Sequence, residues 1–163
     1  KNDLKEILAA TKPEVVYTHN PADKHDTHIA CFWRCLEALR SLPVRLRPKA
    51  VYGCEVWRNL DWLVDTDKVV LDDSANPKLA AKLIGAFVSQ IAGGKRYDLA
   101  IAGRRLANAT FHTSHATDRA NALTWAMDLT PLVHDPKLSV EKYTLGYLDR
   151  LRADVAARLR KFK

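Results

Sequence analysis

Apolar and polar positions fall into blocks along the chain, and the first blocks predict a strand, a polar loop and a helix. Residues 15–17 form a short β-branched and aromatic run, which is typical of a strand buried on both faces. The run gives way to a polar string over residues 18–28. From Ile29 onward apolar residues recur at helical spacing, so a helix is expected there, with Asp26 or Thr27 as its N-cap.

The later blocks continue this alternation. We expect strands over 50–57 and 68–72, a helix that begins at Asn76 and Pro77 and closes at Gly93, a helix over 98–109 and a last helix from Ser139. Such alternation predicts an α/β fold with a largely parallel sheet and flanking helices. A doubly wound sheet usually has about five or six strands, so the sheet is expected to be incomplete in this chain.

Composition is that of one globular domain over residues 1–163, because 47% of the 163 residues are hydrophobic and 28% are charged. This excludes disordered, collagen-like and disulfide-scaffold classes. The three cysteines cannot all pair within one chain, so we expect them to be reduced and packed, which favours a cytoplasmic protein. No apolar run approaches the roughly 18 residues of a membrane span.

The net charge of +7 suits anionic partners such as nucleic acid or phosphorylated metabolites. Residues 141–163 carry seven Lys and Arg against three Asp and Glu, so the last helix holds much of the excess. A solvated helix face explains this pattern. The alternative hypothesis is a non-catalytic basic α/β module that binds nucleic acid or an acidic protein.

The polar string over residues 18–28 is the densest titratable segment, with three of the six histidines and two aspartates. It follows a strand, and ligands of open α/β sheets bind beyond the carboxyl ends of the strands. His25 and His28 are three residues apart at a helix start, where the positive end of the helix dipole lies. One imidazole can therefore bind a zinc ion, which lowers the pKa of its bound water to about 7, while the other imidazole acts as an acid or stabilises the oxyanion. The alternative is that these residues are ordinary caps and turn residues.

The string THNPADKHDTH, between an apolar strand and an apolar helix, resembles the second signature of the PIG-L/LmbE-like family of metal-dependent N-deacetylases. The stretch VYGCEVWR at 51–58 is similar to the family's next strand, and Gly103-Arg104 to its arginine-bearing helix. The resemblance covers most of residues 13–111. It implies a Rossmann-like fold and hydrolysis of N-acetyl groups, mostly on glucosamine-containing compounds, with zinc or another divalent metal as cofactor.

Carried over by position, the resemblance makes His28 a metal ligand and His25 the histidine that stabilises the tetrahedral oxyanion. Thr27 stands where the family usually has an aspartate, so Asp23 or Asp26 is expected to orient His25. The expected substrate-binding residues are Asn20, Glu55, Arg58 and Arg104.

The family's first signature, an A-H-P-D-D type motif that supplies further ligands and the aspartate base, is absent from this sequence. Together with the few strands and the lack of a starting Met, this predicts the C-terminal portion of a deacetylase domain. Such a chain is expected to be inactive by itself unless a missing N-terminal segment or a second chain completes the site. Its expected partners are an N-acetylated amino-sugar conjugate and, as one arrangement, a second copy in a homo-oligomer.

Overall fold

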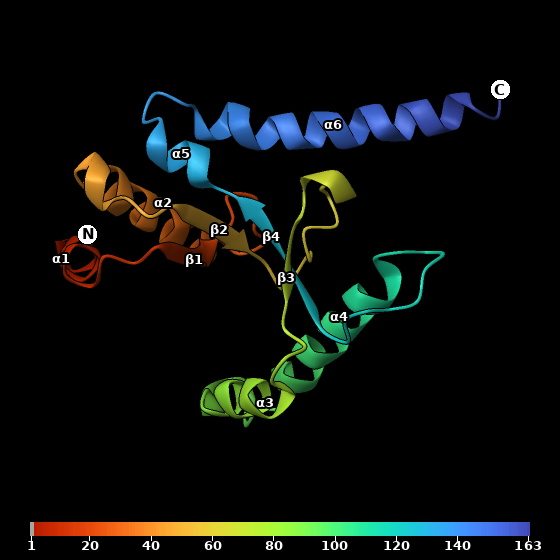
Figure 1. The fold of residues 1–163 in the computed structure, drawn as a ribbon, viewed down its shortest axis with the longest axis horizontal. Coiled ribbons are helices and arrows are strands. Elements are labelled where there is room, and N and C mark those ends of the chain that lie inside the picture. Colours follow the sequence, from red (N-terminus) through yellow and green to blue (C-terminus); the bar gives the residue numbers. More distant parts are fainter. Residues whose placement is uncertain (1) are drawn as a thin grey trace. The chain divides into compact units, whose positions relative to one another are not determined.

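The computed structural model describes residues 2–163, which form two compact units (Figure 1). The first unit contains residues up to Val69 and residues 126–163, and the second contains residues 70–125. The strands are β1 (Val15–His19), β2 (Ala50–Cys54), β3 (Val69–Asp72) and β4 (Leu123–Asp128). The helices are α1 (Asn2–Thr11), α2 (Asp26–Arg40), α3 (Pro77–Gly85), α4 (Tyr97–Phe111), α5 (Thr130–His134) and α6 (Val140–Arg160).

The four strands form one mixed sheet in the order β1-β2-β4-β3. β1 and β2 are parallel and are connected through α2, whereas β2 and β4 are antiparallel. The backbone N–H of Asp73 donates to Ala122 O at 2.9 Å, which places the end of β3 beside the start of β4, so this pair is antiparallel as well. The α/β class is confirmed, but the largely parallel sheet is not. The strand that changes the topology is β4, which the sequence pattern did not reveal.

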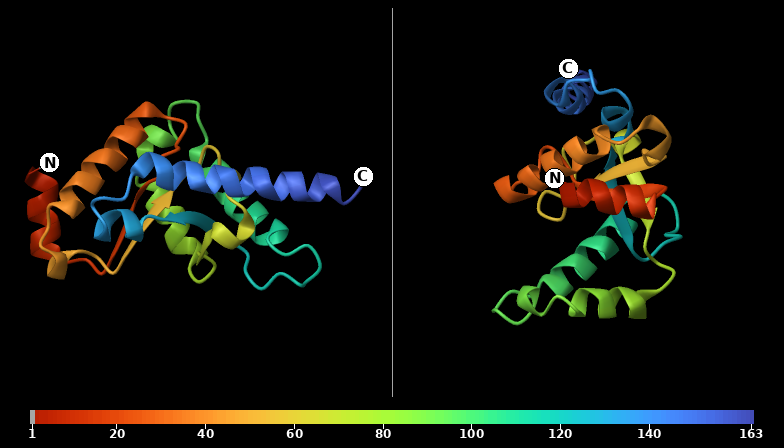
Figure 2. Two further views of the ribbon diagram at one scale, coloured as in Figure 1. Left: turned by 90° about the horizontal axis from the view of Figure 1, so that it is seen from above. Right: turned by 90° about the vertical axis from the view of Figure 1, so that its left-hand side faces the viewer.

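The core of the first unit lies between α2, the β1–β2 pair and α5. Phe32, Leu36 and Leu39 point inward from one side of α2, as the helical spacing predicts. α5 contributes Leu132 and Val133, both fully buried. α6 is one continuous helix of 21 residues, which the left view of Figure 2 shows along its length. No helix among residues 2–163 is long and apolar enough to cross a membrane.

Two predicted helix starts are confirmed at the level of individual hydrogen bonds. The side chain of Asn76 accepts a hydrogen bond from Leu79 N–H, and Pro77 is the first residue of α3. The Ser139 side chain likewise accepts from the backbone of α6. The expected cap of α2 is wrong, because α2 begins at Asp26 and His25 stands at the N-cap without a capping side-chain bond.

Three expectations about burial and length are wrong. β1 is an edge strand, so Tyr17 is 61% exposed rather than buried on both faces. α3 ends at Gly85 and not near Gly93, because the chain turns into a short 3-10 helix after it. Cys31 is exposed rather than packed, although all three cysteines are unpaired.

The second unit joins α4 to its two strand segments through polar side chains. Arg105 donates to Thr124 Oγ1 at 3.1 Å and forms an ion pair with Asp73 at 3.2 Å. Thr124 also donates to Asp73, and the Asn108 amide donates to the backbone carbonyl of Leu123 at 2.9 Å. The buried amide satisfies a carbonyl that would otherwise lie in an apolar interior.

Candidate metal centre

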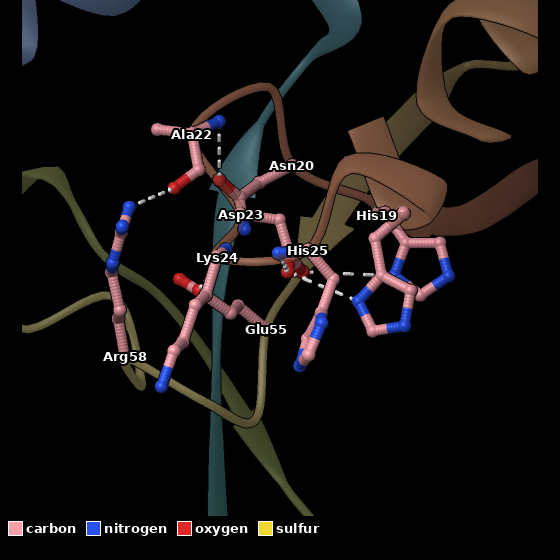
Figure 3. Close-up of polar contacts among 9 residues, drawn as sticks. His19, Asn20, Ala22, Asp23, Lys24, His25, Glu55 and Arg58 are labelled. Atoms are coloured by element: carbon pink, nitrogen blue, oxygen red, sulfur yellow. Dashed lines mark hydrogen bonds and ion pairs between the residues drawn. The ribbon is translucent and has the colours of Figure 1, made fainter. Parts of the chain in front are cut away.

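The candidate site lies in the first unit, where β1 and β2 end at the same edge of the sheet. The parallel register pairs His19 with Cys54, the last residues of the two strands. The polar loop that follows β1 and the segment that begins at Glu55 therefore start side by side (Figure 3). Ligand sites of α/β sheets are built at such an edge, as the sequence analysis expected for the loop.

Side chains of the loop satisfy its own backbone. Asn20 Oδ1 accepts from Ala22 N–H at 2.8 Å, and Asp23 Oδ1 accepts from His25 N–H at 2.9 Å, so each residue closes a tight turn. Arg58 donates to the carbonyl of Ala22 at 2.8 Å and ties the loop to the segment after β2. Asn20 is 0% exposed and Asp23 is 4% exposed, so the loop folds inward at these two residues.

His19, Asp23 and His28 form a group that can hold a metal ion. Their ligand atoms all lie within 4.8 Å of one another. Nδ1 of His28 is 3.0 Å from Asp23 Oδ1, Nδ1 of His19 is 3.8 Å from Asp23 Oδ2, and the two imidazole rings stack at 4.1 Å. Two imidazole nitrogens and one carboxylate oxygen are a donor set that catalytic zinc accepts, with a fourth position left open.

The electrostatics of His19 favour the form that binds metals. Burial lowers the pKa of His19 first, because the charged imidazolium loses its hydration, and the nearby His28 lowers it further. The Asp23 carboxylate acts in the opposite direction. A neutral imidazole is the ligand, so a lowered pKa reduces the competition from protons.

Buried polar atoms without a hydrogen-bond partner gather in this one neighbourhood. Among residues 2–163, the side-chain atoms of this kind are Asn20 Nδ2, Asp23 Oδ2, His25 Nε2, Glu55 Oε2 and Trp62 Nε1. Such atoms are rare in folded proteins because burying one without a partner costs about 1–3 kcal/mol. Three of the five atoms, those of Asn20, Asp23 and His25, belong to the loop that carries the His19–Asp23–His28 group.

His25 and Glu55 border the metal group. The ring of His25 lies 5.2 Å from that of His28 and 4.6 Å from that of Trp57, centroid to centroid. Glu55 is 6% exposed, and its Oε1 accepts from Lys24 N–H at 3.2 Å. Burial raises the pKa of Glu55, and the charge of Asp23 raises it further, while hydrogen-bond donors around the carboxyl group oppose the rise.

The structure places the expected site residues in two separate regions. Asn20, Asp23, His25, His28, Glu55 and Arg58 come together in the first unit, with Asp26 in the first exposed turn of α2. Arg104 lies in α4 of the second unit.

Asp23 contacts the backbone of His25 and the ring of His28, instead of orienting the ring of His25. The sequence analysis assigned no role to His19. Its place as the last residue of β1, nine positions before His28, was the signal that could have identified it.

No family model matches this chain, and neither a curated protein nor a solved structure matches it. The likeness to the PIG-L/LmbE-like family therefore rests on the motifs of the sequence.

Proposed function

We propose that this protein is a zinc-dependent hydrolase that acts on the N-acetyl group of an amino sugar. The observation that carries the proposal is the group of three ligand atoms from His19, Asp23 and His28, beside a buried and unpartnered His25 Nε2. The resemblance of residues 18–28 to a deacetylase signature supports the reaction class. A hydrolase that cleaves a different bond is the alternative, because it would bind its metal ion through the same three residues.

Residues of the loop and of α2 would bind the metal ion and stabilise the charge that develops on the substrate. His19, Asp23 and His28 would hold the zinc ion, which when bound supplies a Lewis acid and a water with a pKa of about 7. His25 would donate a hydrogen bond from Nε2 to the oxyanion that forms when the acetamide carbonyl is attacked. The bond from His25 N–H to Asp23 Oδ1 fixes the position of His25 relative to the metal ligands.

Zinc binding is the first test. Calorimetric titration should give one zinc ion per chain, with binding lost in His28→Ala and strongly reduced in Asp23→Asn. The asparagine keeps an oxygen for His25 N–H but loses the carboxylate charge. His115→Ala, in the segment of the second unit between α4 and β4, serves as the matched control and should bind zinc normally. A zinc content unchanged in His28→Ala contradicts the assignment of ligands.

Catalysis is the second test, with acetate release from N-acetylglucosamine as the readout. In a form of the protein that shows this activity, His25→Ala should keep its zinc and lose about 100- to 1,000-fold in kcat, the usual effect of removing an oxyanion donor. A chelator should abolish the activity. Zinc binding without acetate release from N-acetyl sugars, in a protein completed by the missing N-terminal segment or a second chain, would contradict the deacetylase proposal and leave a metal-binding protein.

The structure gives less support to the alternative of a basic binding module. Arg152 and Arg158 of α6 pair with acidic residues of the same helix, and Arg150 pairs with Asp67 at 2.6 Å. The two acidic residues within α6 that form these pairs are already counted in the net charge of that helix, so only Asp67 offsets part of its positive excess. Binding to nucleic acid would weaken steeply with salt, whereas deacetylation would respond to the chelator.

A further inference from the structure

Trp57 is an exposed aromatic residue next to the candidate metal centre. It is the third residue after β2, and 38% of its surface is accessible to solvent. Its neighbour Val56 is 43% exposed. Single exposed apolar side chains are common on protein surfaces. The exposure of Trp57 is informative because of the residues that its ring contacts.

The indole ring of Trp57 contacts His25, and His25 in turn contacts a residue of the metal group. The ring centroids of Trp57 and His25 are 4.6 Å apart, with an angle of 64° between the ring planes. The ring of His25 lies 5.2 Å from that of His28. A ligand that binds beside His25 is therefore within reach of both the metal group and an indole that solvent can reach.

Lys24 lies over the Trp57 ring, with Nζ 5.5 Å from the ring centroid. Lys24 is exposed, and Figure 3 shows its side chain extending from the loop to the same side as that of His25. The face of an indole carries partial negative charge and attracts the ammonium group, but this attraction is weak at an exposed site. A flexible lysine on an accessible ring is readily displaced by a ligand.

The shape and charge of the ring indicate which ligand replaces the lysine. The carbon-bound hydrogens on one side of a pyranose ring form an apolar surface with partial positive charge, which complements the negative face of an indole. A carboxylate or a phosphate is repelled by that face. A rigid ring also makes more simultaneous contacts with a flat indole than a flexible acyl chain does.

We propose that Trp57 is a platform for the sugar ring of the substrate, on which the carbon-bound hydrogens of a pyranose pack against the indole face. The proposal rests on the proposed function, because that function brings the acetamide of the same sugar to His25. Lys24 leaves the ring when the sugar binds. Trp57 thereby favours N-acetylated sugars over other acetamides, while the metal is held by His19, Asp23 and His28.

Saturation-transfer difference NMR with N-acetylglucosamine tests the platform, because the method reports which ligand protons lie against the protein. In the wild-type protein the ring protons and the acetyl methyl protons should both receive saturation. In Trp57→Ala the signal of the ring protons should fall relative to that of the methyl group, and the sugar should bind about 5- to 50-fold more weakly. Zinc affinity should stay unchanged, because Trp57 is not a ligand.

Three further variants serve as comparisons. Trp57→Phe keeps an aromatic face and should retain sugar affinity to within about 3-fold. Trp33→Ala removes an indole that is 44% exposed in α2 of the same unit, and it should leave sugar binding unchanged. Lys24→Ala uncovers the Trp57 ring and should bind the sugar at least as tightly as the wild type. Circular dichroism shows whether each variant is folded.

The outcomes distinguish this proposal from the previous one. Equal losses of the ring and methyl signals in Trp57→Ala would mean that Trp57 only supports the position of His25, which overturns the platform. A loss of affinity in Lys24→Ala as large as that in Trp57→Ala overturns it as well, because the ammonium group would then hold the ligand. Absence of saturation transfer to the sugar in the wild type has the same consequence. Failure of the wild type to bind zinc overturns the proposed function instead, and the NMR experiment on the metal-free protein then tests Trp57.

Discussion

Replacing Gly53 with alanine tests how tightly the candidate site is fixed to the sheet. Gly53 lies in β2, opposite the loop that carries the metal group, and an added Cβ would lie 2.8 Å from Leu129 Cδ1. It would also lie 3.1 Å from both Cα and Cβ of Asn20. Leu129 is 1% exposed and Asn20 is 0% exposed, so neither has room to move away freely. Space, rather than backbone conformation, requires the glycine.

The magnitude follows from two opposing effects. Overpacking a buried position typically costs about 1–3 kcal/mol, and the reduced entropy of the unfolded chain returns about 0.4–1 kcal/mol. The free energy of unfolding should therefore fall by about 0.5–2 kcal/mol in Gly53→Ala. Because the strain falls on Asn20, the neighbour of His19, zinc should also bind at least about 10-fold more weakly, as when an outer-shell partner of a metal ligand is removed.

Urea unfolding followed by tryptophan fluorescence, and a zinc titration, measure the two quantities. Gly146→Ala in α6 is the matched control in the same unit, since its Cβ would meet only Arg150 Nη1 at 3.8 Å. Alanine in a helix interior should stabilise the protein by about 0.5–1 kcal/mol, which is the opposite sign. A Gly53→Ala protein as stable as wild type, with undiminished zinc affinity, would refute the close packing of β2 against the loop.

Two more outcomes are expected. Because burial raises the pKa of Glu55, the folded state retains a proton that the unfolded chain has already lost, and this contribution to stability disappears as the pH rises above the ordinary value of 4.5. The stability of Glu55→Gln relative to wild type should therefore increase between pH 4.5 and pH 7 in urea titrations; a constant difference would contradict the burial of this charge. Arg47 donates to the carbonyls of Arg40 at 2.8 Å and Val133 at 3.0 Å. Arg47→Lys should lower the free energy of unfolding by about 1–3 kcal/mol, because a lysine cannot make both hydrogen bonds of the planar guanidinium group. Arg45→Lys is the nearby control. Equal urea unfolding curves for the two variants would contradict a stabilising role for the Arg47 hydrogen bonds.

Local signals in the sequence determined the helices and drew attention to the site. The starts of α3 and α6 were predictable because the capping residue and the first turn are neighbours in the chain. The cluster over residues 18–28 was recognisable for the same reason: its histidines and aspartates are close in sequence and lie between a strand and a helix. Metal-binding residues that are close together in the sequence can be recognised before the tertiary structure is known.

Tertiary structure decided which of those residues act together. The parallel register of β1 with β2 brings Glu55 to the edge of the sheet where His19 lies, although the two residues are 36 positions apart in the sequence. The turn at Asp23 directs its carboxylate to His28 and not to the ring of His25. The antiparallel pairing of β4 with β2 joins segments more than 70 residues apart in the sequence, for example Cys54 with Ala126. Such pairings are fixed by the burial of the whole sheet, because no residue pattern within a single strand records which partner it will have.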